Sequence, residues 1–168
     1  MKHELTKVLF LSQWYPHRND PMLGLFVKKH AEAVSLYCKV KVLYVQPDDN
    51  INRLELEEKV THNLSELIVY YPIRKQNKFR KLYNSINYCR AYWKGYKHVC
   101  TDGFKPDIIH ANILTRTAFV AYLLKLWKGI PYVVTEHWSR YLPARNSFNG
   151  TLRKLTTRLV VKNAKAIL

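Results

Sequence analysis

Two histidines stand where apolar, strand-like runs end, and imidazole is the side chain best suited to hydrogen bonding and proton transfer near neutral pH. His137 follows the run 132–135 and comes directly after Glu136. This pair is a candidate for substrate contact, although its position is equally compatible with a histidine that anchors a loop. His110 lies inside or at the end of the run 107–110, where a hydrogen-bonded core histidine is the better interpretation.

A second candidate is Gly24, which opens a predicted helix after the proline-containing loop 13–23. A glycine at this place lets an anionic group approach the backbone amides and the positive end of the helix dipole. The alternative is that Gly24 only lets the chain turn into the helix and that Trp14 and Tyr15 are packing residues. Composition alone favours this alternative.

A third candidate is the basic segment RKQNKFRK at 74–81, which leads into a helix rich in Tyr and Trp. Such a mixture can stack on bases or bind lipid head groups. The aromatic residues are most simply core, which leaves the basic side chains on the solvated surface. An acidic membrane attracts each of them by about 1 kcal/mol, so they are predicted to contact a membrane or an acceptor phosphate. They are Arg74, Lys75, Lys78, Arg80 and Lys81.

Several cofactor motifs are missing from the sequence. The first loop lacks the G-x-G-x-x-G spacing of dinucleotide binding, and neither a Walker A motif nor a zinc-ligand pattern occurs. Nicotinamide, flavin and P-loop chemistry are therefore disfavoured, and no metal is expected. The cysteines at 38, 89 and 100 have no paired spacing, which favours a reducing, cytoplasmic setting over a disulfide framework.

The charge is distributed unevenly along the 168 residues, whose formal net charge is +16. Residues 1–66 contain 9 Lys or Arg against 9 Asp or Glu, whereas residues 67–168 contain 19 against 3. Such a field favours an anionic partner, whether nucleic acid, acidic lipid head groups or a phosphorylated small molecule. The amino terminus does not read as a signal peptide, and no apolar stretch approaches the roughly 20 residues that cross a bilayer.

The elements that must position these residues alternate between short apolar runs and stretches of helical period. Strands are predicted at 8–11, 40–45, 67–71, 107–110 and 132–135, with the start of a further strand in AKAIL at 164–168. Helices are predicted at 24–36, 79–100, 117–127 and 151–161. Residues 46–66 are acidic and loosely patterned. Because the chain stops within strand-like AKAIL, we expect it to continue in nature.

This alternation predicts a Rossmann-like α/β fold, a parallel sheet with helices on both faces. Ligands of such sheets bind beyond the carboxyl ends of the strands, so the loops 13–24, 111–116 and 136–145 should converge. Asn112 and Arg116 point into the same predicted mouth. The longest helix is predicted to bury a stripe of residues that recur every three or four positions: Phe79, Leu82, Tyr83, Ile86, Cys89, Trp93, Tyr96 and Cys100.

Four landmarks follow one another along the chain: WYPHRNDPMLGLFVKKHAEAV, PDIIHAN, GIPYVVTEHWS, and a helix followed by AKAIL. In combination and order they resemble the amino-terminal half of glycosyltransferase family 4 enzymes, which are retaining transferases of the GT-B fold. The resemblance implies that residues 1–168 form the acceptor-side domain of a two-domain enzyme. The donor-binding domain, which would hold most contacts to the nucleotide diphosphate sugar, is absent from this chain, so the chain alone should have little or no transferase activity.

The resemblance also suggests roles for single residues. His137 matches the family histidine that contacts the transferring sugar and steadies its oxocarbenium-like charge, which implies a catalytic role. Gly24 matches the first-loop glycine that faces the donor phosphates or the acceptor. Asn112 stands where the common His-x-His form has its second histidine. Arg116 and Glu136 are further candidates for substrate binding because of their places in the predicted loops, although Glu136 is not a general feature of the family.

As partners, the resemblance implies a nucleotide sugar, a glycan or lipid-linked acceptor of cell-surface polysaccharide synthesis, and the missing carboxyl-terminal domain. A hexosyltransferase of this kind would be cytoplasmic, with peripheral contact to the inner membrane face. Two alternatives remain: a basic module that binds nucleic acid or an anionic membrane, although no nucleic-acid recognition motif occurs, and a GT-B-like nucleotide-sugar epimerase.

Overall fold

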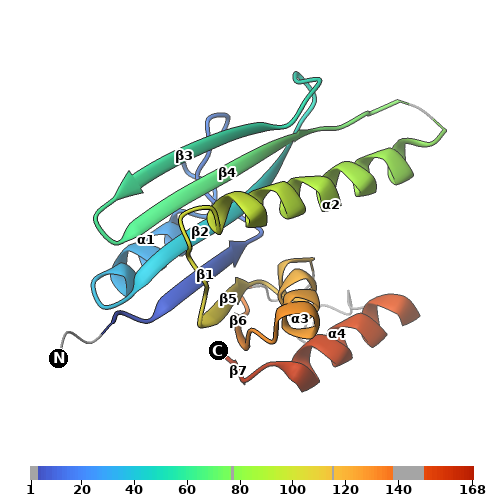
Figure 1. Ribbon diagram of the computed structural model, residues 1–168. Coiled ribbons are helices and arrows are strands. Elements are labelled where there is room, and N and C mark those ends of the chain that lie inside the picture. Colours follow the sequence, from blue (N-terminus) through green and yellow to red (C-terminus); the bar gives the residue numbers. More distant parts are fainter. Residues whose placement is uncertain (1–3, 77, 115, 138–149) are drawn as a thin grey trace.

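Continuous apolar runs form the central strands of a seven-stranded sheet in this computed structural model, which describes residues 4–76, 78–114, 116–137 and 150–168. The strands are β1 (Lys7–Ser12), β2 (Lys39–Asp48), β3 (Glu55–Thr61), β4 (Leu64–Pro72), β5 (Ile108–Asn112), β6 (Tyr132–Thr135) and β7 (Ala166–Ile167). Their order across the sheet is β3-β4-β2-β1-β5-β6-β7 (Figure 1). Neighbours are parallel except β3 and β4.

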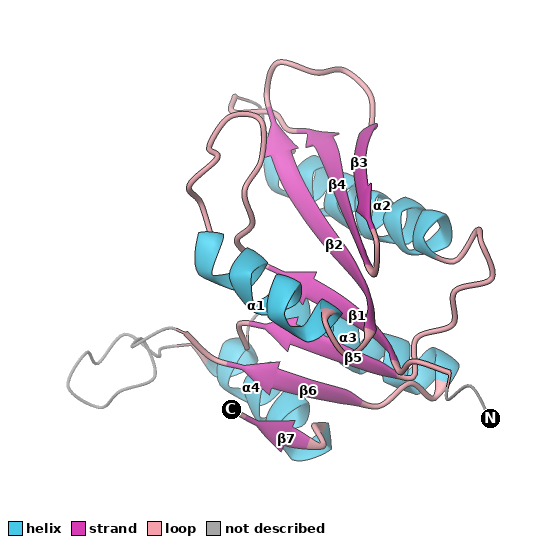
Figure 2. Ribbon diagram, turned by 90° about the vertical axis from the view of Figure 1, so that its left-hand side faces the viewer, coloured by secondary structure: helices cyan, strands magenta, loops and turns pink. Residues whose placement is uncertain are grey.

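Helices cover both faces of this sheet because parallel strands need crossover connections. The helices are α1 (Leu25–Ser35), α2 (Arg80–Val99), α3 (Arg116–Lys128) and α4 (Thr151–Asn163). Figure 2 shows α1 across one face, with the other three behind the sheet. Phe10 and Val42 pack under α1, whereas Leu9, Leu11 and Leu43 pack in the core under α2, α3 and α4. The predicted Rossmann-like α/β fold is confirmed.

Strand β3 lies in the region 46–66, for which no strand or helix was predicted. It pairs antiparallel with β4 at the edge of the sheet and is mostly exposed. Side-chain hydrogen bonds hold β3 to β4: the Tyr70 hydroxyl donates to Glu57 over 2.8 Å, and the Ser65 hydroxyl donates to Glu58 over 2.7 Å. Charged edge strands resist pairing with other chains, so the acidic pattern belongs to an edge rather than to a loop.

Helix α2 buries a different stripe from the predicted one. Its buried residues are Asn87, Ala91, Tyr92, Gly95 and Val99. The predicted stripe is largely exposed, at 69% for Phe79, 62% for Leu82, 49% for Ile86 and 47% for Trp93. The reason is close packing, because a Cβ atom on Gly95 would lie 2.5 Å from Leu43 Cδ1. Ala91 and Gly95 therefore face the sheet, and most large apolar side chains of the predicted stripe turn outward.

Two element boundaries affect the candidate site. Strand β5 extends to Asn112, which therefore lies in the strand rather than beyond it, and α3 begins at Arg116. The strand predicted in the run 164–168 is confirmed as β7, which pairs parallel with β6.

Gly24 ends the first loop in a left-handed conformation, with φ of 64° and ψ of 25°. A Cβ atom on this residue would lie 2.4 Å from both the carbonyl carbon and the carbonyl oxygen of Trp14. The backbone of the first loop thus packs directly against the start of α1. Gly24 has a structural reason to be glycine, as the packing alternative proposed.

We expect Gly24→Ala to lower the free energy of unfolding by more than about 2 kcal/mol, because a rigid backbone contact adds to the strain of positive φ. Gly103→Ala is the matched control, since Gly103 has φ of 77° and no atom within 4 Å of an added Cβ. It should lose only about 1 kcal/mol. Urea denaturation measures both, and equal losses would show that the contact with Trp14 contributes nothing.

Candidate functional site

The carboxyl ends of β1, β5 and β6 meet at one edge of the sheet, and the segments that follow them lie in contact. His137 Nε2 lies 3.3 Å from Asn112 Oδ1, which joins the ends of β6 and β5. The ring of Phe26, in the first turn of α1, packs edge-on against His137 with 4.6 Å between centroids. The structure therefore brings His137 together with Asn112 and the helix start at Gly24. Residues 138–145 of the third predicted loop lie outside the described residues.

Asn112 is fully buried at the end of β5. Its Oδ1 faces His137, and its Nδ2 has no hydrogen-bond partner within the described part of the chain. A buried amide donor without a partner is unfavourable by about 1–3 kcal/mol, so such groups are rare in cores. Beside His137, this amide is well placed to donate to a ligand.

Three histidines from different elements, His30, His110 and His137, lie close together beside Asn112. His30 of α1 packs edge-on against His110, with 4.9 Å between ring centroids, and His110 Nε2 lies 2.6 Å from Thr135 Oγ1. Burial, the largest cause, acts together with His30 and His137 to lower the pKa of His110 to about 4. His110 is thus the buried, hydrogen-bonded histidine that its sequence position suggested.

His137 itself is a neutral imidazole near pH 7. Burial lowers its pKa, and nearby His30 lowers it further, whereas the carboxylate of Glu136 acts in the opposite direction. A neutral imidazole can donate from one ring nitrogen and accept at the other. His137 can therefore hydrogen-bond a hydroxyl group without adding a positive charge.

A strained turn follows Asn112. Ile113 has φ of 81°, which is an outlier for a β-branched residue. Its N–H donates to the Thr135 carbonyl over 2.8 Å, and the Thr117 hydroxyl lies 2.7 Å from its carbonyl oxygen. Glu136 Oε2 accepts the Leu114 N–H over 2.9 Å. Glu136, predicted as a substrate contact, thus supports this turn.

Arg116 lies in a neighbouring pocket of about 250 Å³ at the carboxyl ends of β1, β2 and β4. Its guanidinium carbon is 5.9 Å from the ring centroid of Tyr88, and no described carboxylate forms an ion pair with it. Trp14 lines this pocket and also packs against Phe26. Contacts from Trp14 to Phe26 and from Phe26 to His137 therefore connect the pocket with the Asn112–His137 pair. The other lining residues include Gln13, Tyr44, Gln46 and Tyr71.

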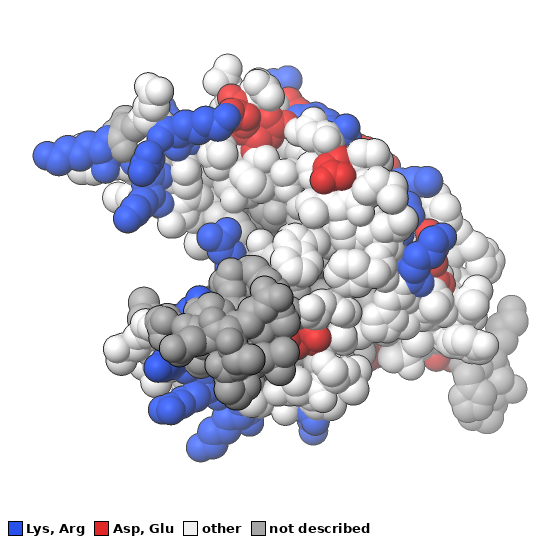
Figure 3. All heavy atoms as spheres, turned by 180° about the vertical axis from the view of Figure 1, so that it is seen from behind, with Lys and Arg blue, Asp and Glu red and all other residues white. Residues whose placement is uncertain are grey.

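The basic segment 74–81 is exposed and lies apart from His137. Lys75 pairs with Asp49, the Arg74 guanidinium stacks 4.3 Å from the Tyr83 ring centroid, and Arg80 donates to the Lys75 carbonyl over 2.8 Å. Lys78 and Lys81 are exposed as well. Seen from behind, Lys and Arg side chains gather on the upper lobe of the molecule (Figure 3).

Sequence patterns gave no functional signal for Phe26, His30 or Tyr88. Phe26 and His30 lie on α1 and reach the site only through the packing of that helix against β1 and β5. Tyr88 comes from α2, far along the chain from Arg116. The one feature that could have pointed to His30 is its position about two turns after Gly24, on the same helix.

Neither a metal cluster nor a membrane span is found in the described ranges. No three His, Cys, Asp or Glu side chains gather there in a way that could hold a metal ion. The helices described are too short or too polar to cross a bilayer.

Comparisons with known proteins give a family match and structural matches. The model of the glycosyl transferase 4-like domain family matches residues 56–168, which include Asn112, Arg116 and His137 but not Gly24. A solved structure described as trehalose-6-phosphate from E. coli bound with UDP-2-fluoro glucose is 12% identical, with a TM-score of 0.47. The similarity covers 94% of this chain and 43% of that one, so it spans less than half of the larger protein. No curated protein matches the sequence.

We expect the stability of the protein to fall below pH 6.5 because of His110. Its pKa is about 4 when folded and about 6.5 when unfolded, so the unfolded state binds more protons between these values. The stabilising contribution, about 3 kcal/mol, is present above pH 6.5 and is lost as the pH falls toward 4. Urea denaturation at pH 7 and pH 4.5 measures this difference.

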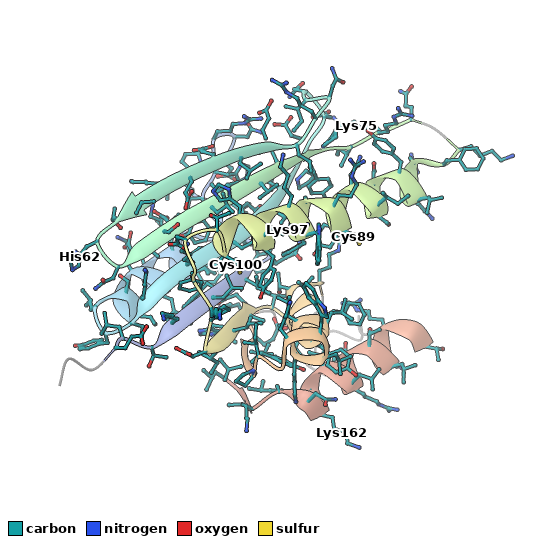
Figure 4. The ribbon with its side chains drawn as sticks, viewed as in Figure 1. His62, Lys75, Cys89, Lys97, Cys100 and Lys162 are labelled. Atoms are coloured by element: carbon teal, nitrogen blue, oxygen red, sulfur yellow. The ribbon has the colours of Figure 1, made fainter. Side chains whose placement is uncertain are left out.

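His110→Gln should reduce this pH dependence. His62→Gln, in the exposed turn between β3 and β4 (Figure 4), is the matched control and should keep it. An NMR titration that placed the pKa of His110 near 6.5 would contradict the prediction.

Proposed function

The chain belongs to the glycosyl transferase 4-like domain family, and we propose that it is the acceptor-side, amino-terminal domain of a retaining transferase with two Rossmann-like halves. The observation that carries the proposal is the pairing of His137 with Asn112 beside the start of α1, at the carboxyl ends of parallel strands. Ligands of open α/β sheets bind at this edge. The second, donor-binding domain would close over it.

In this proposal His137 contacts the sugar as it transfers from a nucleotide diphosphate. The reacting sugar gains positive charge as its bond to the diphosphate breaks, so a cationic imidazole would repel it. The lowered pKa of His137 keeps the ring neutral, and the ring can orient a sugar hydroxyl by hydrogen bonding. The unpartnered Nδ2 of Asn112 supplies a second donor at the same place.

The diphosphate charge is assigned to the start of α1 and to basic side chains. The first turn of α1 contains no acidic residue that would oppose an anion, and helix amino termini favour negative charge. The proposal includes no metal. In the same closed site, Arg116 lies at the neighbouring pocket and faces the acceptor.

The acceptor that best fits this charge pattern is a lipid-linked, phosphate-bearing molecule at the inner membrane face, in cell-surface polysaccharide synthesis. The basic side chains of the segment 74–81 are exposed, and each of these cations near an acidic bilayer contributes about 1 kcal/mol of attraction. Because the donor half lies outside these 168 residues in this proposal, the chain alone is expected to transfer no sugar.

The test is His137→Ala in the complete protein, assayed with UDP- and GDP-hexoses and lipid phosphate acceptors. We expect kcat to fall about 10²–10³-fold, as for loss of one preorganised hydrogen-bond donor. His62→Ala is the control and should retain full activity. If the His137 variant transferred sugar at the rate of the unaltered enzyme, the proposed site would be wrong.

A further inference from the structure

An apolar groove of about 490 Å³ runs between α2 and α3, on the sheet face opposite α1. Leu43 of β2 lies at its floor, and Tyr92, Trp93, Leu123 and Trp127 are among its walls. In Figure 4, Cys89 and Lys97 mark the side of α2 that borders it. This volume lies within the range of 300–1,000 Å³ that is usual for small-molecule sites.

The lip of the groove leaves large apolar side chains in water. Trp93 is 47% exposed, Leu123 47%, Leu126 64% and Trp127 52%. The two indole rings pack against each other with 5.0 Å between centroids, so they form a continuous apolar surface rather than scattered contacts. Contiguous patches of this kind mark interaction sites.

The groove continues toward the candidate site. Tyr88 lines both the groove and the pocket of Arg116 at the strand carboxyl ends. In the other direction, Trp93, Tyr96 and Trp127 also line a hollow of about 570 Å³ that extends to Pro106. Three hollows that share lining residues thus follow α2, with Arg116 at one end, and together they are called the apolar track.

The charge around this track has one sign. Helices α2 and α3 contain eight Lys or Arg residues and no Asp or Glu. Lys97 stacks 4.7 Å from the Trp93 ring centroid and Lys128 3.7 Å from that of Trp127. No acidic side chain lines the groove or its two extensions within the described residues. A ligand with a long apolar part and an anionic head complements both features.

We propose that the α2–α3 groove binds the hydrocarbon chain of a single anionic lipid, with its phosphate head at Arg116. This inference rests on the proposed function, because it makes the bound lipid the acceptor of the transferase. The groove would place the phosphate head group at the carboxyl ends of the strands, near Asn112 and His137. It thereby selects acceptors by the length of their apolar chain.

The test is calorimetric titration of the 168-residue chain with dodecyl phosphate below its critical micelle concentration. We expect saturable binding of one molecule per chain. Leu123→Glu places a charge in the groove and should weaken binding about tenfold or more. Leu36→Glu is the matched control, because Leu36 is 72% exposed and lies at the end of α1, and it should leave the affinity unchanged.

A second measurement needs no substitution. Cys89 is exposed and lines the groove, whereas Cys38 lies between α1 and β2. Dodecyl phosphate should slow the alkylation of Cys89 and leave that of Cys38 unchanged, as followed by mass spectrometry. For the head group, Arg116→Gln should weaken binding of dodecyl phosphate and leave binding of dodecyl maltoside unchanged.

Three results would overturn the proposal: binding to anionic vesicles without binding of monomeric dodecyl phosphate, a dimer that Leu123→Glu dissociates without any alkyl phosphate binding, and equal affinity of the Leu123 and Leu36 variants. In the complete protein, Leu123→Glu should raise the KM for a long-chain acceptor and leave transfer to a short-chain acceptor unchanged. Loss of the proposed function itself would appear instead as full activity of His137→Ala.

Discussion

The central strands are buried on both faces, and this constraint determines where the site can be. Strands covered on both sides by helices connect through crossovers, so β1, β2, β4, β5 and β6 run in one direction and end at one edge. Asn112, His137 and the start of α1 meet because each ends or follows one of these strands. The chemistry at this edge therefore depends on apolar residues such as Leu9 and Leu43, which lie in the core.

Around Asn112 the structure holds several unfavourable local features together. Ile113 has positive φ, Asn112 carries an unpaired amide donor, and His110 is buried with a strongly lowered pKa. Strain and unsatisfied groups of this kind cluster at ligand sites, where surrounding contacts hold them in place. Here those contacts come from Thr117 and Glu136. Both of these hydrogen bonds are made to backbone atoms of Ile113 and Leu114.

The sequence predicted what local patterns determine and missed what packing determines. The runs 40–45 and 132–135 are strands because continuous apolar residues suit burial on both faces, whereas β3 is an exposed, charged edge that carries no such signal. The helical period of α2 was correct, but its buried stripe was not, because Ala91 and Gly95 allow close approach to the sheet. His137 and Asn112 were predicted from their places at strand ends. The contact of Phe26 with His137 depends on tertiary packing alone.

The strand order also determines the sequence in which the strands can pair during folding. Val8 of the central strand pairs with Val40 on one side and with Ile108 on the other. Contacts between near neighbours in the chain close at a smaller entropic penalty than distant ones, so β1, β2 and β4 can join first. During synthesis, β1 has no partner on the side of Asn112 and His137 until β5 has left the ribosome. The unpaired edge of β1 is then exposed, and the nascent chain is most prone to association during that interval.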